Sequence, residues 1–150
     1  MFDKNKTLVI GCDHGGYETK EFIVNKLKEF GYKVNDKGTY SEESVDYPDF
    51  IHPVAYSIQT GEYERGIIIC GSGNGAQMTA NKYSKVRAAL CWKNELAELA
   101  RLHNNANILA LPGRFVTNEE AWEMVNTFLT TSFEGGRHQK RIEKLSKILK

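Results

Sequence analysis

The sequence has little excess charge and contains no long apolar run. Twenty Lys and Arg side chains stand against nineteen Asp and Glu, for a formal net charge of +1, so no global field attracts nucleic acid or an anionic membrane. No stretch nears the roughly 18 apolar residues of a membrane-spanning helix, and residues 1–6 carry no apolar signal region. We therefore expect a cytoplasmic protein without nucleic-acid or membrane partners, in which any anion is bound locally.

Cysteine is also scarce. Cys12, Cys70 and Cys91 lie far apart in the sequence and form no C-x-x-C pair or Cys/His ligand cluster. The pattern therefore predicts no zinc or other metal site. Without further context, each cysteine is interpreted as a buried, unreactive thiol.

The remaining composition is that of an ordinary globular domain. Of 150 residues, 41% are hydrophobic and 26% are charged, close to the averages for soluble domains. A chain of this length buries roughly 70% of the surface that its unfolded form exposes. We expect one soluble domain that spans residues 1–150.

Apolar runs alternate with segments of helical spacing along the whole chain. Strands are predicted at residues 8–12, 32–36, 66–70, 86–92 and 108–111. Helices are predicted at residues 22–30, 51–58, 76–83, 94–103 and 118–131, and a final basic helix begins at Arg137. This alternation predicts an α/β fold of three layers, with a five-stranded parallel sheet between two layers of helices.

Residues that can take part in catalysis or ligand binding follow several of these elements. Asp13 and His14 follow the first strand, Cys70 ends the central one, and His103 with Asn104 ends the helix after the fourth. Ligands of open α/β sheets bind outside the carboxyl ends of the strands. We therefore expect these residues to lie near one edge of the sheet or its neighbour.

The loop after the central strand reads Gly71, Ser72, Gly73, Asn74 and Gly75. Three glycines that open into a helix let backbone N–H groups approach an anion such as phosphate or an oxyanion. A tight turn between strand and helix is the plainer alternative. A dinucleotide site is disfavoured, because residues 91–93 read Cys-Trp-Lys where its acidic residue is required.

Three side chains near these loops are candidates for acid-base chemistry. Cys70 precedes a helix amino terminus, where the helix dipole favours a thiolate that can act as a base. His14 beside Asp13 can bind phosphate or transfer a proton, and His103 is similar. The alternatives are a structural thiol, a loop histidine beside a capping Asp13, and a His103 that only interacts with a helix dipole.

The last helix carries a possible anion site. Arg137 and Arg141 are one turn apart on one face, where two guanidiniums can grip a phosphate. Ile142, Leu145 and Leu149 are predicted to form the opposite, apolar stripe. A solvated basic face is the alternative, and His52 and His138 are interpreted as structural.

Ordered motifs along the chain resemble the B-type ribose-5-phosphate isomerases, from about residue 8 to residue 145. These motifs are Gly11-Cys12-Asp13-His14, Asp36-Lys37-Gly38-Thr39, Asp46-Tyr47-Pro48, Cys70 to Gly75, Ala80-Asn81-Lys82, His103-Asn104 with Asn107, and Glu134 to His138. The resemblance implies a flavodoxin-like, Rossmann-like sheet with a C-terminal helix. It also implies no cofactor or metal, a sugar-phosphate substrate, and a homodimer or dimer of dimers with sites at the subunit interface.

The same resemblance assigns roles to individual residues. Cys70 would move a proton between two carbon atoms, and His103 would open the furanose ring. Asp13 and Ser72 would steady the sugar and the thiol, and the amides of Gly71 to Gly75 would stabilise an enediolate. The phosphate contacts would come from His14, Arg137 and Arg141, completed by Asn104 and Arg114. Residues from His103 to Arg114 would come from the partner subunit.

Some relatives in this family place a glutamate after the glycine loop instead of the cysteine. This chain has Ala76 and Gln77 there, so the resemblance makes Cys70 indispensable. The expected reaction is the interconversion of D-ribose 5-phosphate and D-ribulose 5-phosphate. Isomerisation of a six-carbon sugar such as allose or galactose 6-phosphate is the alternative within enzymes, and a non-catalytic phosphosugar- or nucleotide-binding module is the alternative outside them.

Overall fold

The computed structural model describes residues 1–150 and contains one sheet of five strands, all of whose pairs are parallel. The strands are β1 (Thr7–Cys12), β2 (Lys33–Asp36), β3 (Gly66–Cys70), β4 (Ala88–Leu90) and β5 (Ile108–Pro112), in the spatial order β2-β1-β3-β5-β4. The predicted parallel sheet is confirmed. Strand β4 is shorter than predicted, because the Arg87 N–H donates to the side chain of Asn107 and the Val86 N–H to a turn carbonyl.

Helices connect and cover the strands. They are the short 3₁₀ helix η1 (His14–Gly16) and the α-helices α1 (Tyr17–Glu29), α2 (Tyr47–Gln59), α3 (Asn74–Ala80), α4 (Asn94–Asn104), α5 (Asn118–Thr130) and α6 (Arg137–Lys144). Capping residues mark the start of α5. Thr117 and Glu120 form a capping box, in which each side chain accepts a hydrogen bond from the other residue's main-chain N–H. No helix in the chain has both the length and the apolar character needed to cross a bilayer.

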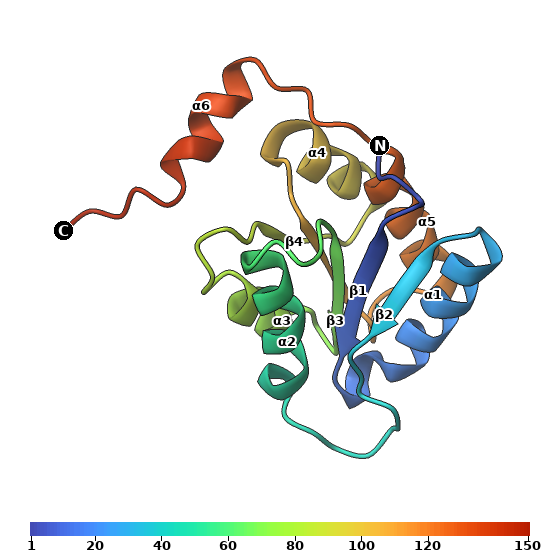
Figure 1. The fold of residues 1–150 in the computed structure, drawn as a ribbon. Coiled ribbons are helices and arrows are strands. Elements are labelled where there is room, and N and C mark those ends of the chain that lie inside the picture. Colours follow the sequence, from blue (N-terminus) through green and yellow to red (C-terminus); the bar gives the residue numbers. More distant parts are fainter.

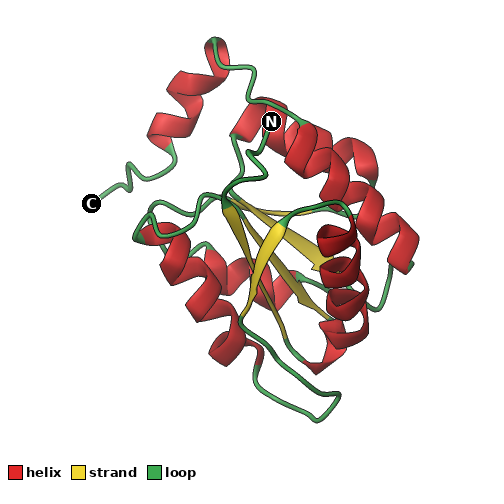
Figure 2. Cartoon of the chain, turned by 45° about the vertical axis from the view of Figure 1, so that its right-hand side comes forward, coloured by secondary structure: helices red, strands yellow, loops and turns green.

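The sheet lies between two layers of helices (Figures 1 and 2). Two hydrophobic cores fill the spaces between the sheet and these helices. Successive strand residues point to opposite faces, so Ile67 and Ile69 enter the core under α1, α4 and α5. Ile68 and Cys70 enter the core under α2 and α3. Because both faces of the central strand are covered, all five residues of β3 are buried. The continuous apolar run in the sequence has this cause.

The order of the strands creates a crevice between β1 and β3. From β1 the chain passes through α1 to β2 on one side, and it then returns through α2 to β3 on the other side. The helices that leave these two strands therefore cover opposite faces of the sheet. A ligand site is expected outside the carboxyl ends of the strands at such a reversal.

Helix α6 lies apart from this body, beside α4, and the chain ends beyond it (Figure 1). The predicted apolar stripe on this helix needs correction. The helix ends at Lys144, so Leu145 and Leu149 follow it, and Leu149 is 96% exposed. The chain itself covers little of these side chains, since Leu145 is 62% exposed, and a helix this short gains little without packing.

Candidate active site

Cys70 ends strand β3 at the reversal of the sheet, and its side chain is 5% exposed. The glycine loop follows directly and leads into α3. Gly73 has φ of 79°, and a Cβ atom there would come within 2.4 Å of the Leu90 side chain. A side chain at this position is therefore excluded by backbone conformation and by space. Position 73 must therefore be glycine for the main chain to turn beside the thiol.

The loop after β1 is held against the glycine loop. The Asp13 N–H donates to the Ile69 carbonyl at 3.2 Å, and an Asp13 carboxylate oxygen accepts from the Gly15 N–H at 2.9 Å. Asp13 is thus buried and caps η1, as the alternative of a capping Asp13 predicted. Its neighbour His14 accepts a hydrogen bond at Nδ1 from the Val45 N–H. This bond leaves the His14 proton on Nε2, available to an external ligand.

The loop after β5 completes this edge of the sheet. The Gly113 N–H donates to the Cys70 carbonyl at 2.9 Å, and the Arg114 N–H donates to the Gly71 carbonyl at 3.0 Å. The Arg114 side chain lies over Gly71, where an added Cβ would be 3.3 Å from its guanidinium. Arg114 forms no ion pair with any acid in the chain. It is therefore available to an anion.

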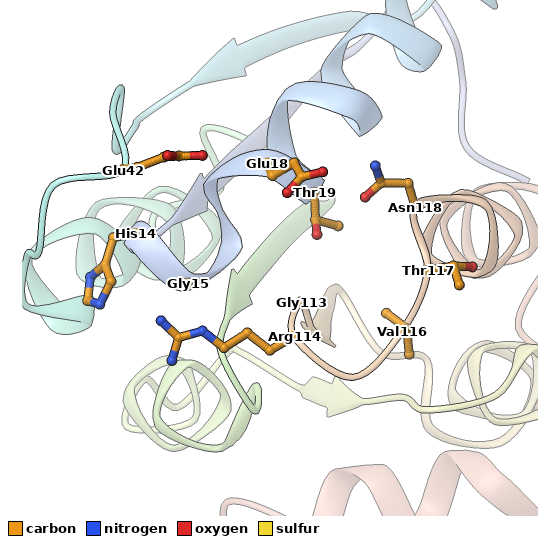
Figure 3. A pocket seen from close by; sticks show the side chains of 10 residues that line it. All are labelled: His14, Gly15, Glu18, Thr19, Glu42, Gly113, Arg114, Val116, Thr117 and Asn118. Atoms are coloured by element: carbon orange, nitrogen blue, oxygen red, sulfur yellow. The ribbon is translucent and has the colours of Figure 1, made fainter.

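A cavity of about 540 Å³ opens between these loops, and the Arg114 guanidinium extends toward the side where His14 lies (Figure 3). Its lining residues are His14, Gly15, Glu18, Thr19, Glu42, Gly113, Arg114, Val116, Thr117 and Asn118. The sequence analysis missed most of them. Residues 116–118 follow the last strand and begin a helix, so the predicted strand end could have identified them as lining residues. Glu42 lies in a long loop and has no such signal.

The other two cysteines have no comparable setting. Burial raises the pKa of Cys12 to about 12, although Lys20 nearby acts against the shift. Burial alone raises the pKa of Cys91 to about 12. Both thiols stay protonated at neutral pH, and neither is a nucleophile or a base there. Their interpretation as structural thiols fits these surroundings.

The second group of predicted residues lies at the opposite end of the sheet. His103 stands in the last turn of α4, which leads to the amino end of β5. It stacks on His138 of α6, with the ring centroids 4.3 Å apart, and its Nε2 is 3.7 Å from a carboxylate oxygen of Glu134. Sequence analysis treated His138 as structural and did not connect it with His103, because the two are 35 positions apart (138 minus 103).

Asn104, Arg137 and Arg141 are in the same region and are exposed. Neither arginine forms an ion pair in the chain. Figure 1 shows α6 beside α4, away from the ends of β1 and β3 where the glycine loop begins. The expectation that His103 and Asn104 lie near the same edge of the sheet as Asp13, His14 and Cys70 is therefore wrong within one chain.

His103 and Arg114 do not lie together within one chain, and their supply by a partner subunit stays a prediction. Arg114 packs on Gly71 of its own chain, whereas His103 lies at the far end of β5. A strand separates them, since β5 runs from Ile108 to Pro112 and its two ends face opposite edges of the sheet. One chain therefore presents two partial sites, the first with a thiol and an anion-binding loop, and the second with an imidazole pair and two free guanidiniums.

Known proteins match this chain over a length that includes both partial sites. A family model described as Ribose/Galactose Isomerase matches residues 8–145. The ribose-5-phosphate isomerase B of Escherichia coli (strain K12) is 43% identical over 143 residues, which are 95% of this chain and 96% of that protein. These matches include both the glycine loop and helix α6.

Solved structures agree with this. A ribose 5-phosphate isomerase from Thermotoga maritima is 50% identical, with a TM-score of 0.93 over 95% of this chain and 99% of the other. The ribose-5-phosphate isomerase B of Mycoplasma genitalium, solved with bound ribulose-5-phosphate, is 43% identical, with a TM-score of 0.90 over 94% of each chain. The resemblance noted in the sequence is confirmed, and this chain belongs to the ribose/galactose isomerase family.

Proposed function

We propose that the chain catalyses the reversible isomerisation of D-ribose 5-phosphate and D-ribulose 5-phosphate through a cis-enediolate, by general acid-base catalysis without a metal. The names of its relatives support this reaction, as does the ribulose-5-phosphate bound to the Mycoplasma genitalium protein. The observation that carries the proposal is Cys70 at the start of the glycine loop. This position offers a base beside N–H groups that can stabilise an oxyanion.

In this mechanism Cys70 removes a proton from C2 of the sugar and delivers it to C1. The negative charge of the enediolate forms on oxygen, where the amides of residues 71–75 would donate hydrogen bonds. Asp13 and Ser72 would hold the sugar and the thiol. His103 would act before this step by giving a proton to the ring oxygen of the furanose as the bond between that oxygen and C1 breaks. The C1 hydroxyl then loses its proton to solvent, which leaves the open-chain aldehyde.

The phosphate would be held from two sides. His14 and Arg114 line the cavity beside the glycine loop, and Arg137, Arg141 and Asn104 lie at the other end of the chain. We infer that a second subunit supplies the latter group together with His103, in a homodimer or a dimer of dimers. The exposed apolar residues after α6 support this inference, because a subunit surface would bury them.

The proposal is tested with purified protein, ribose 5-phosphate and no added metal. In deuterated water, the enzyme is expected to form ribulose 5-phosphate and to exchange the carbon-bound proton of the sugar. A binding module would leave that proton in place, and such a result would refute the proposal. Faster turnover of allose or galactose 6-phosphate than of ribose 5-phosphate would instead assign the chain to six-carbon sugars.

The role of His103 is tested separately with His103→Asn. Loss of a general acid is expected to lower turnover of ribose 5-phosphate by about 10²-fold or more. An aldose phosphate that cannot close into a furanose should be affected much less, since it has no ring to open. His52→Asn is the control, because His52 lies on α2 in contact with Tyr83 and away from both partial sites. Equal losses on both substrates would remove the ring-opening role.

A further inference from the structure

The carboxylate of Glu134 faces two stacked imidazoles. One oxygen is 3.7 Å from Nε2 of His103, and the other is 3.8 Å from Nε2 of His138. The rings are nearly parallel, at 15°. The three side chains come from the end of α4, the loop before α6 and the first turn of α6. At these distances none of the contacts is a hydrogen bond. The three side chains therefore lie close together without hydrogen bonds between them.

His138 is the unusual member of this group. It is 4% exposed, and its Nε2 is buried without a hydrogen-bond partner in the protein. Buried polar atoms are nearly always bonded, and an exception in a native structure requires an explanation. The Nε2 atom faces Glu134 and lies next to the ring of His103. A ligand placed among the three side chains would satisfy it.

We propose that His103, Glu134 and His138 form a binding site for a divalent transition-metal ion, with Zn²⁺ the best chemical match. Their ligand atoms lie within 4.8 Å of one another. Two imidazoles and one carboxylate form a donor set that zinc accepts, with a fourth position left for water or another ligand. Mg²⁺ and Ca²⁺ are disfavoured, because they prefer oxygen ligands.

Binding requires a small movement. With bonds of about 2.0 to 2.1 Å to a tetrahedral ion, the donor atoms would be roughly 3.3 Å apart, so the cluster must contract. Because two parallel rings cannot both point at one ion, one of them must also turn. His103 can do so, since its side chain is 38% exposed and makes no hydrogen bond, and Glu134 is 53% exposed. The buried His138 would be the fixed ligand.

The charges around the site set its character. Burial lowers the pKa of His138, and the neighbouring His103, Arg137 and Arg141 act in the same direction, while Glu134 opposes them. A neutral His138 can bind an ion without first losing a proton. The two arginines repel a cation, and Glu134 is the only acid in the cluster. The site therefore favours ions with high affinity for imidazole, and it should bind them more weakly than a site with several acids.

This site has a consequence that rests on the proposed function. If His103 supplies the proton for ring opening, a metal ion on its imidazole removes that proton donor. Zinc then inhibits the isomerase by capturing a catalytic side chain, and a chelator reverses the inhibition. The metal would be a regulator or inhibitor rather than part of the reaction.

The binding itself is tested without any activity measurement. Zn²⁺ is titrated into the whole purified protein in competition with a chromophoric chelator, and one ion per chain is expected. Loss of a residue that only supports a metal ligand weakens binding by about 10- to 100-fold. Glu134→Gln and His138→Gln remove ligands themselves, so each should weaken zinc binding by at least that much. Glu143→Gln and His52→Gln are the matched controls, since Glu143 bonds Gln139 on the outside of α6 and His52 lies on α2. Both controls should bind as the parent does.

Two further measurements identify the ligands. Co²⁺ in place of zinc should give the visible bands of a nitrogen and oxygen site, without the strong ultraviolet band of a thiolate ligand. Cys70→Ser should bind zinc as tightly as the parent does. Binding that survives in Glu134→Gln and His138→Gln, or that disappears in Cys70→Ser, would overturn the proposal. Because Glu134 is exposed, its variant keeps the test valid if the buried His138→Gln unfolds.

The activity arm distinguishes this proposal from the proposed function. Zinc should inhibit ribose 5-phosphate turnover in the parent, and Glu134→Gln should need at least about tenfold more zinc for the same inhibition. A parent that binds zinc at the cluster but has no isomerase activity would refute the function and leave the site intact. An active parent whose zinc binding is unchanged by the cluster variants would refute the site alone.

Discussion

The two ends of the sheet hold their candidate residues in different ways. At the carboxyl end, main-chain hydrogen bonds join the loops after β1, β3 and β5, as between Gly113 and Cys70. At the amino end, His103 and Arg141 are side chains on helices, and the apolar residues after α6 are exposed. We call the first the complete end, because its loops are bonded to one another within one chain, and the second the incomplete end, because most of its candidate side chains are exposed. Each end is one of the two partial sites. The difference supports the proposal that a site forms where the two ends of different subunits meet.

The largest expected effect concerns the complete end. Cys70→Ser replaces a thiol by a hydroxyl that cannot ionise at neutral pH, and turnover of ribose 5-phosphate should fall at least about 10²-fold while binding persists. Steady-state kinetics and a binding titration measure the two quantities. Cys91→Ser is the control, since that thiol is buried in the other core, on the opposite face of the sheet from Cys70. Near-normal turnover by Cys70→Ser would show that another group at this end is the base.

The next effect concerns the incomplete end. Hydrogen bonds to charged groups contribute about 1.5 to 3 kcal/mol, so Arg137→Ala or Arg141→Ala should raise KM roughly 10- to 100-fold if chemistry limits turnover. Inorganic phosphate should also compete less well. The double variant should lose less than the sum, since both groups contact one ligand.

Lys140→Ala on the same helix is the control for charge alone, because Lys140 is exposed and makes no ion pair. If the arginine variants and the Lys140 variant bound substrate alike, α6 would be only a solvated basic face. The amino end would then have no part in the site.

Mixed subunits test the comparison directly. Cys70→Ser and the Arg137→Ala, Arg141→Ala double variant are co-expressed with different tags, and the hybrid dimer is purified. If each site takes Cys70 from one chain and the arginines from the other, one of the two sites in the hybrid contains both lesions and the other contains none. The hybrid should then recover about half of the parent activity at low substrate. If the hybrid were no more active than the two variant homodimers, all these residues would belong to the same subunit's site.

Most of the fold followed from local sequence patterns. The apolar run 66–70 and the helical spacing of its neighbours define elements whose order requires parallel pairing, and all five strands are present. Cys70 and Asp13 were predictable as site residues because strand ends are set by the same pattern. Errors arose where contacts are distant in sequence. The stack of His138 on His103 depends on the path of α6 beside α4, which no local period encodes. The separation of His103 from Arg114, by contrast, follows from the predicted strand between them, and the sequence analysis did not draw that consequence.

The smallest effect on activity is expected at Lys20, which is fully buried behind the complete end. Its ammonium contacts Asp36 at 2.6 Å and Glu21 at 3.0 Å. Burial by itself lowers the pKa of Lys20, but the hydrogen bonds to Asp36 and Glu21 outweigh it and raise the pKa above its usual value. The folded state thus holds this proton more tightly than the unfolded state. Its contribution to stability is fully present below about pH 10.4, the value for an unfolded chain, and is lost as the pH rises further.

Lys20→Met should therefore lower the free energy of unfolding by about 1 to 3 kcal/mol at neutral pH, and it should remove part of the alkaline loss of stability seen in the parent. Urea unfolding at pH 7 and above pH 10 measures both quantities. Lys26→Met on the same helix is the matched control. Its ion pair with Glu29 is largely exposed, so we expect a change of about 0.5 kcal/mol or less. Turnover should stay near the parent value in both variants. If Lys20→Met were as stable as Lys26→Met, or equally sensitive to alkali as the parent, the ion pair would not help to stabilise the complete end.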